Sequence, residues 1–586
     1  MKHNFSLGIF LFLTTLSLLS SCGNTRDKSD SIRIHWAHDP ETLDPMLLPN
    51  QAAIDANNLL HVSLLQADIT NHKFAPALAT TLPSVELVGD SLTKLSYDIQ
   101  PLAAWDNGQP VTARDVEFTL KLMFCPGLPN EVARSRYRFI RAVLTDPKAP
   151  QHFALVCRGQ ALEYVEASGD FFILPEAALD PRGQLRRFTL ADLQKRAATA
   201  PSDSVLQAIA RRYQAADPGR FPDHIPGCGP YKLVKWEKDR YLTFRRKTRW
   251  WADRLRPAPV VLQARPKQLE YVIIPDAATA TLALRRGDID VYPQMPAREF
   301  ARLRASATAG SAFNFYSTAS YDVVMVGFNT RRPPLGNALT RRALSRLFDT
   351  AGLLQATQLG AGQRTVGVIS PSERANYNDS LPLISFDPAG AAALLRQAGW
   401  QRGAEAGTGW TRKSGGGEPE QLRLTMRYRA DESLFSTVAL QFQAAAAGLD
   451  ISVTLQPTES GAFTTSLKAG DFDLYVRVLR GNPFMFNFTP VFHSLGMDAG
   501  NTTGFSSPAS DQLIEAIAVA DSKRRRTQLL RRFQALMQRE APIVPLFFLP
   551  SRIVADRHLT GLHVGSLKPG FMATTIERAP KPSAVP

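Results

Sequence analysis

Residues 105–116, Trp-Asp-Asn-Gly-Gln-Pro-Val-Thr-Ala-Arg-Asp-Val, carry more information about the fold of this chain than any other segment. The preceding residues 95–99 alternate apolar and polar side chains, which is the period of a half-buried strand. Gly108 can adopt the positive φ of a tight turn. Thr112 is a suitable N-cap, and Asp115 favours the positive end of a helix. The segment therefore predicts a strand, a turn and the start of a helix.

The same string resembles the signature of the large extracytoplasmic solute-binding proteins of ABC importers, the peptide- and nickel-binding family. Three further strings, in the family's order, support the resemblance: Gly-Cys-Gly-Pro-Tyr at 227–231, Arg-Gly-Asp-Ile-Asp at 286–290 and Arg-Arg-Ala-Leu at 341–344. In the first of these, Cys228 replaces the threonine that is usual in the family. The resemblance extends from about Ile32 to His563 and so covers most of the chain.

The order of elements also indicates the fold class, because strands that alternate with helices are typical of α/β lobes. The resemblance implies an α/β, two-lobed periplasmic-binding-protein-like fold (type II, cluster C), with an inserted subdomain in the first lobe. It also implies a two-strand hinge at Phe313–Met325 and Leu546–Val554. The implied divisions are lobe I at 31–70, 201–310 and 552–578, its inserted subdomain at 71–200, lobe II at 311–551 and a loose tail at 579–586.

The first residues are typical of an exported protein. Lys2 precedes an apolar run at 5–19 that is too short for an ordinary membrane span. Leu-Ser-Ser-Cys-Gly at 19–23 matches a bacterial lipoprotein box. We therefore predict a signal peptide at 1–21, lipidation of Cys22 as the mature N-terminus, and a polar tether at 22–30. A plain signal peptide and an N-terminal anchor helix are the alternatives.

The chain carries a formal net charge of +15, a balance that fits nucleic acid, anionic lipid or an acidic ligand. The charge is scattered, and the basic runs at 245–247 and 523–532 are interpreted as solvated faces, so we predict no nucleic-acid partner. Beyond Cys22, an oxidising compartment permits one disulfide, and the spacing does not suit a zinc site. The pairing stays open among Cys125, Cys157 and Cys228.

No catalytic motif is present in the sequence. It has no Gly-x-Ser-x-Gly elbow, no His-Glu-x-x-His and no phosphate-binding glycine loop, so we predict no enzyme, no cofactor and no resident metal. A secreted hydrolase is the rival from another class. His35 and His38, together with His61 or His493, form the alternative of a metal site, and packing or surface histidines are the simpler interpretation.

The resemblance also indicates where a ligand binds. It places contacts on the first loop, around the Gly-x-Gly-Pro-Tyr turn, and after the Phe-Asp-Leu strand of the second lobe. The residues carried over are His38, Asp39, Pro40, Glu41, Tyr231, Arg480 and Asn482. Trp36 and Trp105 are further aromatic candidates for the cleft wall, or else core residues.

The last of these segments departs from the family. Peptide binders commonly have an aspartate there that holds the peptide's α-ammonium, but this chain has no carboxylate between Asp473 and Asp498. A buried ammonium without a counter-charge is costly. We therefore predict that a free-amine peptide is not bound in the usual way. Arg477 or Arg480 could instead meet a carboxylate or phosphate through a bidentate contact, unless they face solvent.

The resemblance implies a lipid-anchored solute-binding protein that faces the periplasm or the cell exterior. It would act as a monomer that captures a peptide or peptide-like solute between two lobes, closes about its hinge and delivers the solute to an ABC permease. A ligand-sensing protein without a transport role is the nearest alternative, and a binder of nickel or another metal chelate is another.

Overall fold

The protein is described by a computed structural model over residues 31–89, 91–160, 163–196, 203–405, 407–413, 418–481, 483–484, 486–496 and 500–579. Several sequence-based predictions lie outside these residues. They are the signal peptide at 1–21, Cys22 and the tether at 22–30, the site residue Asn482, and all of the predicted tail except residue 579.

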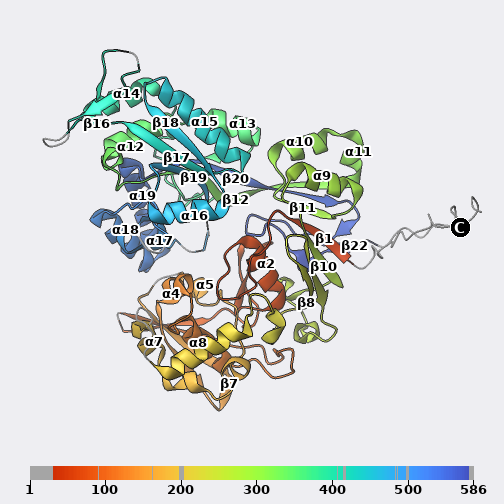
Figure 1. Ribbon diagram of the computed structural model, residues 1–586. Helices are drawn as coiled ribbons and strands as arrows, with labels where there is room; N and C mark the ends of the chain where they lie inside the picture. Colours follow the sequence, from red (N-terminus) through yellow and green to blue (C-terminus); the bar gives the residue numbers. More distant parts are fainter. Residues whose placement is uncertain are drawn as a thin grey trace, which may run out of the picture.

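One 11-stranded sheet runs through both lobes (Figure 1). Two long antiparallel strands join its halves: β12 (Phe313–Phe328) and β20 (Ile543–Asp556). The pairing register of β12 with β20 is interrupted between Ala319 and Val323, close to where the two strands pass from one lobe to the other. The strand order is β18 (Ser452–Thr458), β17 (Arg423–Arg429), β19 (Leu474–Arg480), β12, β20, β11 (Val291–Pro293), β1 (Ser31–Trp36), β10 (Gln268–Ile273), β9 (Tyr241–Arg246) and β8 (Tyr231–Glu237), with β13 (Gln363–Arg364) beside β20. The predicted two-strand hinge is confirmed.

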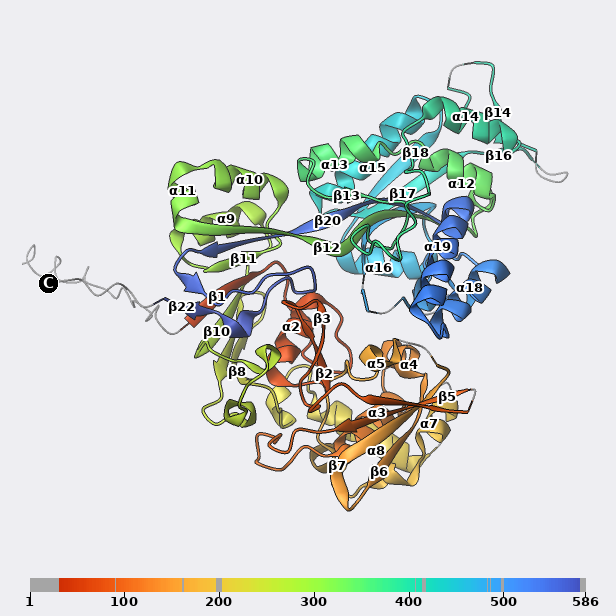
Figure 2. The same cartoon turned by 180° about the vertical axis from the view of Figure 1, so that it is seen from behind.

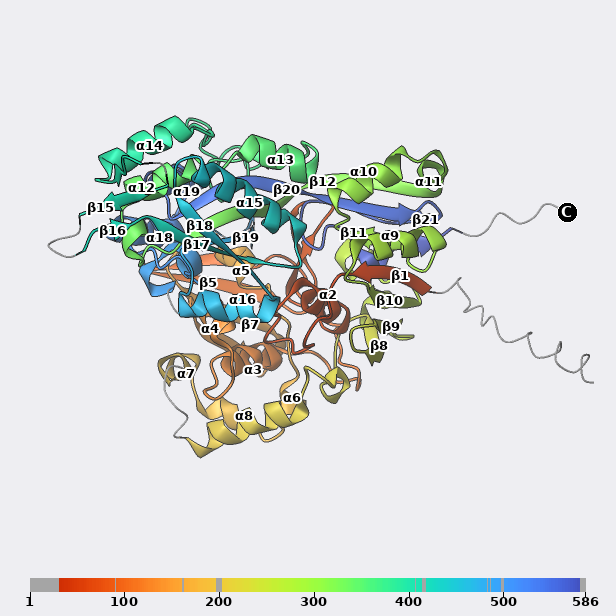
Figure 3. The same cartoon turned by 45° about the horizontal axis from the view of Figure 1, so that its top comes forward.

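In lobe II, helices cover both faces of the sheet, because side chains that alternate along the strands form a hydrophobic core on each face. Val324 and Val326 of β12 face one core, whereas Met325 faces the other. Figure 3 shows α14 and α15 on one side of β17 and β18, and α16 on the other. The first face is covered by α12 (Ala338–Ser345), α14 (Pro388–Gln397) and α15 (Ser433–Ala447). The second is covered by α16 (Ser460–Ala469), α18 (Pro508–Ala518) and α19 (Lys523–Glu540).

Lobe I places two groups of helices around its strands. Leu284, Phe300 and Val554 join α9–α11 to β11 and β20 in a separate small core. The helix α2 begins at Asn50, whose side chain accepts a hydrogen bond from the Ala53 amide. The helices are α2 (Gln51–Leu60), α9 (Ala277–Arg286), α10 (Ala297–Ala305) and α11 (Ala307–Ala312).

The inserted subdomain is a four-stranded antiparallel sheet covered by helices (Figure 2). Its core is continuous with that of lobe I. The helix α8 (Ser204–Ala216) contacts both parts of the chain: Gln214 Nε2 donates to Gly127 O of the subdomain at 3.0 Å, and the Tyr213 hydroxyl donates to Asp44 Oδ1 of lobe I at 2.6 Å. The hairpin of β2 (Leu65–Asp68) and β3 (Lys73–Pro76) spans the predicted division at residue 70. The subdomain contains β4 (Ser84–Val88), β5 (Leu92–Asp98), β6 (Ile140–Asp146), β7 (Ala149–Arg158), α3 (Ala113–Met123), α4 (Glu131–Tyr137), α5 (Tyr164–Ala167), α6 (Glu176–Leu179) and α7 (Leu190–Arg196).

Residues 105–116 form the predicted turn and helix start. The Gly108 amide donates to Trp105 O at 2.8 Å, and α3 begins at Ala113. The Thr112 amide donates to Asp115 Oδ2 at 2.8 Å, which caps the helix. Asp106 ties this turn to lobe I, because its carboxylate lies 2.5 Å from Lys247 Nζ and its amide donates to Gly227 O.

The glycine turn at 227–231 serves packing. A Cβ on Gly229 would lie 2.5 Å from Leu59 O, and a Cβ on Gly227 would lie 2.4 Å from Leu60 O. Only glycine therefore lets the end of α2 approach this closely. The indole Nε1 atoms of Trp250 and Trp251 both donate to the carbonyl of the intervening Cys228.

The three described cysteines, Cys125, Cys157 and Cys228, are buried and form no disulfide. Burial raises the pKa of each thiol to about 12, so these groups are inert packing residues at neutral pH. Over the residues that the structure covers, no helix has both the length and the apolar character needed to cross a bilayer.

Candidate ligand-binding cleft

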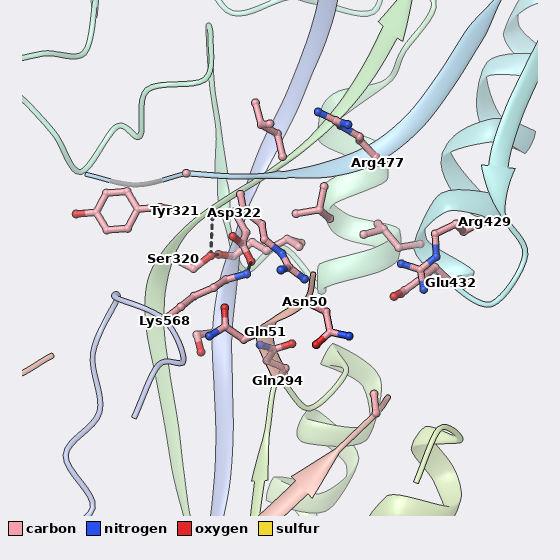
Figure 4. A pocket seen from close by; sticks show the side chains of 18 of the residues that line it. Asn50, Gln51, Gln294, Ser320, Tyr321, Asp322, Arg429, Glu432, Arg477 and Lys568 are labelled. Carbon is pink, nitrogen blue, oxygen red and sulfur yellow. Dashed lines mark hydrogen bonds and ion pairs between the residues drawn. The ribbon is translucent and has the colours of Figure 1, made fainter. Parts of the chain in front are cut away.

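A cleft of about 2020 Å³ lies between the two lobes and is lined by residues of both, of the inserted subdomain and of the crossing strands. Its volume exceeds the 300–1,000 Å³ typical of pockets for drug-sized ligands. The cleft therefore has room for a solute larger than a single amino acid. Figure 4 shows side chains from separate elements converging on it.

The crossing strand β12 supplies the floor of the cleft. The Ser320 hydroxyl donates to Leu549 O on β20 at 2.6 Å, and the Asp322 amide donates back to Ser320 Oγ at 3.2 Å. This interruption of the ladder directs Asp322 into the cleft, as irregularities in strand pairing commonly do. Lys568, from the C-terminal loop, approaches Asp322 Oδ2 to 2.6 Å, and Figure 4 shows the two side chains together.

The first turn of α2 forms the wall on the lobe I side. Gln51 Nε2 donates to Asp55 Oδ1 at 2.7 Å. Burial raises the pKa of Asp55 to about 7, although the Gln51 hydrogen bond and the charges of Lys568 and Arg480 act in the opposite direction. Asp55 is therefore a carboxyl group that changes its charge near neutral pH.

The end of β19 forms the wall on the lobe II side. Arg480 lies directly opposite Asp322 in the β12–β19 register, and Arg477 lies opposite Met325. Arg477 Nε is buried and has no hydrogen-bond partner in the described part of the chain, and its guanidinium lies 5.7 Å from the ring centroid of Tyr475. The Gly481 amide donates to Tyr321 O at 2.9 Å, which joins this segment to the floor.

A second charged group follows β17. Arg429 contacts both carboxylate oxygens of Asp431, at 3.0 Å and 2.5 Å. Burial raises the pKa of the neighbouring Glu432, and the positive charge of Arg429 opposes that shift. His38 of lobe I lines the same cleft.

Some of the predicted site residues line the cleft, whereas others lie outside its lining. His38 and Arg480 line the cleft, as does Trp36. Tyr231 is fully buried, and its hydroxyl donates to Pro266 O at 2.9 Å. Asn482 lies outside the described residues, between Gly481 and Pro483, which both line the cleft.

The predicted loop at 38–41 is held by one carboxylate. Asp39 Oδ2 accepts hydrogen bonds from Trp236 Nε1 and from the Asp239 amide, both at 3.0 Å, and Asp39 Oδ1 accepts from the Glu41 amide. Asp39 and Pro40 are buried, whereas Glu41 is exposed with φ of 64°. These three residues shape the loop that presents His38, and they stand outside the cleft lining.

The charged cleft residues that sequence reasoning missed carry no local motif. Asp55 and Asp322 are isolated acids on a helix and a strand, and Lys568 lies 246 positions after Asp322. The sequence signal available for Asp322 was its place in the predicted hinge strand. Glu432 had no such signal.

The described residues do not support the alternative of a metal site built from histidines. No group of three or more His, Cys, Asp or Glu positioned to hold a metal ion occurs among the residues described. His35 Nε2 contacts Ile274 O at 2.8 Å, and burial lowers the pKa of His35 to about 4. His493 lies instead beside Asp511 and Glu515 in lobe II.

Two lobes joined by two crossing strands, with a cleft between them, define a two-lobed ligand-binding protein. The model of the bacterial extracellular solute-binding proteins, family 5 Middle, matches residues 73–496, and the chain belongs to this family. The resemblance seen in the sequence and the predicted fold class are both confirmed.

Named relatives agree with that assignment. The chain is 23% identical to the nickel-binding periplasmic protein of Escherichia coli (strain K12) over 370 residues, 60% of this chain and 66% of that protein. It is 29% identical to the probable di/tripeptide-binding protein 5 of Pseudomonas aeruginosa (strain UCBPP-PA14) over 338 residues, 57% of this chain and 58% of that protein. These matches span less than two thirds of the relatives' own lengths. The relatives are named as binding proteins, which supports the prediction that the chain is not an enzyme.

The fold extends further than these sequence matches. The oligopeptide-binding protein AppA from Bacillus subtilis, solved in complex with a nonapeptide, superposes with a TM-score of 0.74. The sequences are 18% identical, and the superposition covers 94% of this chain and 99% of that one. At this identity the likeness concerns the fold.

Proposed function

We propose that this chain is the solute-binding component of an ABC importer and that it captures a peptide or peptide-like solute in the cleft. The observation that carries the proposal is a large cleft lined by both lobes and floored by the two strands that join them. Family membership supports the binding role, and relatives named for di/tripeptides and oligopeptides support the ligand class.

The mechanism is closure of the lobes around the solute. A ligand that contacts both lobes favours the closed arrangement in proportion to its extra contacts in that arrangement. The strands β12 and β20 would act as the hinge, with their interrupted register as the compliant point. A membrane permease would then receive the solute from the closed protein.

Export and anchoring complete the proposal. Cleavage before Cys22 and its acylation would hold a monomeric protein on the membrane surface through the tether at 22–30. Several acyl chains, at about 0.8 kcal/mol per buried CH₂, make such an anchor long-lived. Replacement of Cys22 by serine should release the protein from the membrane fraction, and unchanged membrane association would refute lipidation.

Native mass spectrometry of the full chain, purified in detergent, tests the binding role. We expect a co-purified solute, or an upward shift of the melting temperature with short peptides, since saturation at 100 times Kd stabilises by about 2.7 kcal/mol. Lys94→Gln, on the distant subdomain sheet, is the control and should bind as the natural protein does. A protein that carries no solute, and that no peptide in a di- to nonapeptide panel stabilises, would contradict the proposal.

A further inference from the structure

The hydrophobic core of lobe II that contains Met325 reaches the surface inside the cleft. Apolar side chains from three separate segments lie at this edge of the core: the loop before residue 370, the end of β19, and the segment at α17 (Thr489–Phe492). They are half-buried, pack against the core and line the cleft, and we call them the apolar patch: Val368, Leu479, Phe488 and Val491. The cleft therefore has an apolar wall beside its charged floor.

The pleat of β19 directs Leu479 toward this patch. Side chains alternate across a strand, so Leu479 packs against the same core as Tyr475, whereas its neighbour Val478 packs against the core on the opposite face of the sheet. Leu479 is only half-buried by these contacts, and it belongs to the cleft lining. The sheet thus fixes the direction of a side chain whose remaining surface faces the cleft.

Aromatic rings support the patch from within the core. The Phe488 ring stacks on the ring of buried Phe533, with the centroids 4.5 Å apart and the planes at 12°. The ring centroids of Phe486 and Phe492 each lie 6.4 Å from that of Phe488. Aromatic pairs at such separations attract each other. Because Phe488 is held by these neighbours, a ligand does not have to order it on binding.

The inserted subdomain contributes a further apolar side chain to the cleft. Val132 of α4 belongs to the cleft lining and is 74% exposed. Figure 1 shows α4 and α5 next to α17, and Glu163, directly before α5, accepts the hydrogen bond of the Phe486 amide at 3.0 Å. Apolar surface is therefore left to water on both sides of a concave site, which is typical of a place where a ligand binds.

We propose that the apolar patch is a subsite that receives a bulky apolar side chain of the solute. The inference rests on the proposed function and deepens it, because it specifies a peptide or peptide-like solute that carries an aliphatic or aromatic side chain. Contact of such a side chain with Leu479 and Phe488 removes apolar surface of both partners from water, which favours binding. A polar side chain of the same size gives up its hydrogen bonds to water there without gaining a partner.

The experiment is isothermal titration of the full chain with trialanine, Ala-Leu-Ala and Ala-Gln-Ala, whose central side chains compare an apolar with a polar group of similar size. Each peptide is used free and N-acetylated, so that the result does not depend on recognition of the amine. The neutral dye N-phenyl-1-naphthylamine is the non-peptide probe. Leu479→Gln is the test variant. Leu513→Gln is the matched control, because Leu513 is half-buried against the same core but stands outside the cleft lining. Melting temperatures without ligand verify that both variants fold.

We expect Ala-Leu-Ala to bind at least about tenfold more tightly than the other two peptides, since burial of the added methylene groups is favourable. Leu479→Gln should reduce this preference to less than about threefold, whereas Leu513→Gln should retain it. Peptides that bind without this preference, or a preference that the two variants change equally, would overturn the subsite and leave the proposed function intact.

The dye decides the case in which no peptide binds. Dye binding that Leu479→Gln weakens and Leu513→Gln does not would then support the subsite and overturn the peptide ligand. Absence of dye binding, or dye binding that is the same in both variants, would overturn the subsite and the proposed function together.

Discussion

Asp290, the last residue of the Arg-Gly-Asp-Ile-Asp string, should be one of the most sensitive positions of lobe I. Its carboxylate is 2% exposed and lies 3.0 Å from Arg33 Nη2 and 2.9 Å from Arg578 Nη2. It also accepts the Arg33 amide at 2.8 Å. These contacts join β1 and β11 to the short C-terminal strand β22 (Glu577–Arg578).

Asp290→Ala would leave two arginines without their shared acid. Removing one partner of a buried ion pair costs about 3–5 kcal/mol, and because the arginine side chains are 17% and 23% exposed, water recovers part of this. We therefore expect a loss of about 2–4 kcal/mol in the stability of lobe I. For a unit of this size, that corresponds to a fall in melting temperature of at least about 4 °C.

Differential scanning calorimetry measures this loss and resolves lobes that unfold separately. Asp288→Ala is the matched control, since Asp288 is exposed and lies two residues away on the same string. A fall for Asp290→Ala no larger than that for Asp288→Ala would refute the reasoning, because the buried ion pairs would then contribute nothing.

Three further predictions concern the cleft, the lobe contact and the glycine turn. Because burial raises the pKa of Asp55 to about 7, its contribution to the stability of the folded protein is fully present below the unfolded pKa and is lost as pH rises through 7. Asp55→Asn should therefore make the melting temperature less dependent on pH between pH 4 and 8. A variant with the same pH dependence of the melting temperature as the natural protein would contradict this. Glu163 Oε2 of the subdomain accepts a hydrogen bond from the Phe486 amide of lobe II at 3.0 Å, a contact that holds the two sides of the cleft together. Glu163→Ala should therefore accelerate ligand release in stopped-flow measurements. An unaltered dissociation rate would exclude this role of Glu163. Gly229→Ala should destabilise by about 1–3 kcal/mol in thermal unfolding, because its Cβ would meet the backbone atom Leu59 O at 2.5 Å. Gly310→Ala should not, because its Cβ would meet Arg304 O at 3.8 Å, an ordinary contact distance. Equal effects of the two substitutions would argue against the steric reason.

Local signals predicted the elements well where a few neighbouring residues set them. The turn at 105–108 and the capped start of α3 follow from Gly108, Thr112 and Asp115 alone. The helix α9 likewise ends at a local signal, because Gly287 adopts the left-handed conformation of its C-cap. The division of the chain stays a prediction, because the core of the subdomain is continuous with that of lobe I and α8 contacts both.

The candidate site was predicted only in part for the same reason. His38 and Arg480 line the cleft, and their roles as ligand contacts stay predictions. Tyr231 and Asp39 lie in the same strings but are engaged in internal hydrogen bonds. A sequence motif that identifies a family reflects the packing of the fold as readily as the contacts with a ligand.

By itself, the sequence determined the family, the α/β class, the two-strand hinge and the absence of an acid between Asp473 and Asp498. Only the tertiary structure decided which charges meet: it places Lys568 against Asp322 and sets Arg480 across from that acid on the next strand. The physical reason is the separation along the sequence over which each kind of interaction acts. Turn chemistry, capping and side-chain periodicity act over a few residues, whereas the chemistry of the cleft depends on strand register and on an interruption in β12 that brings distant residues together.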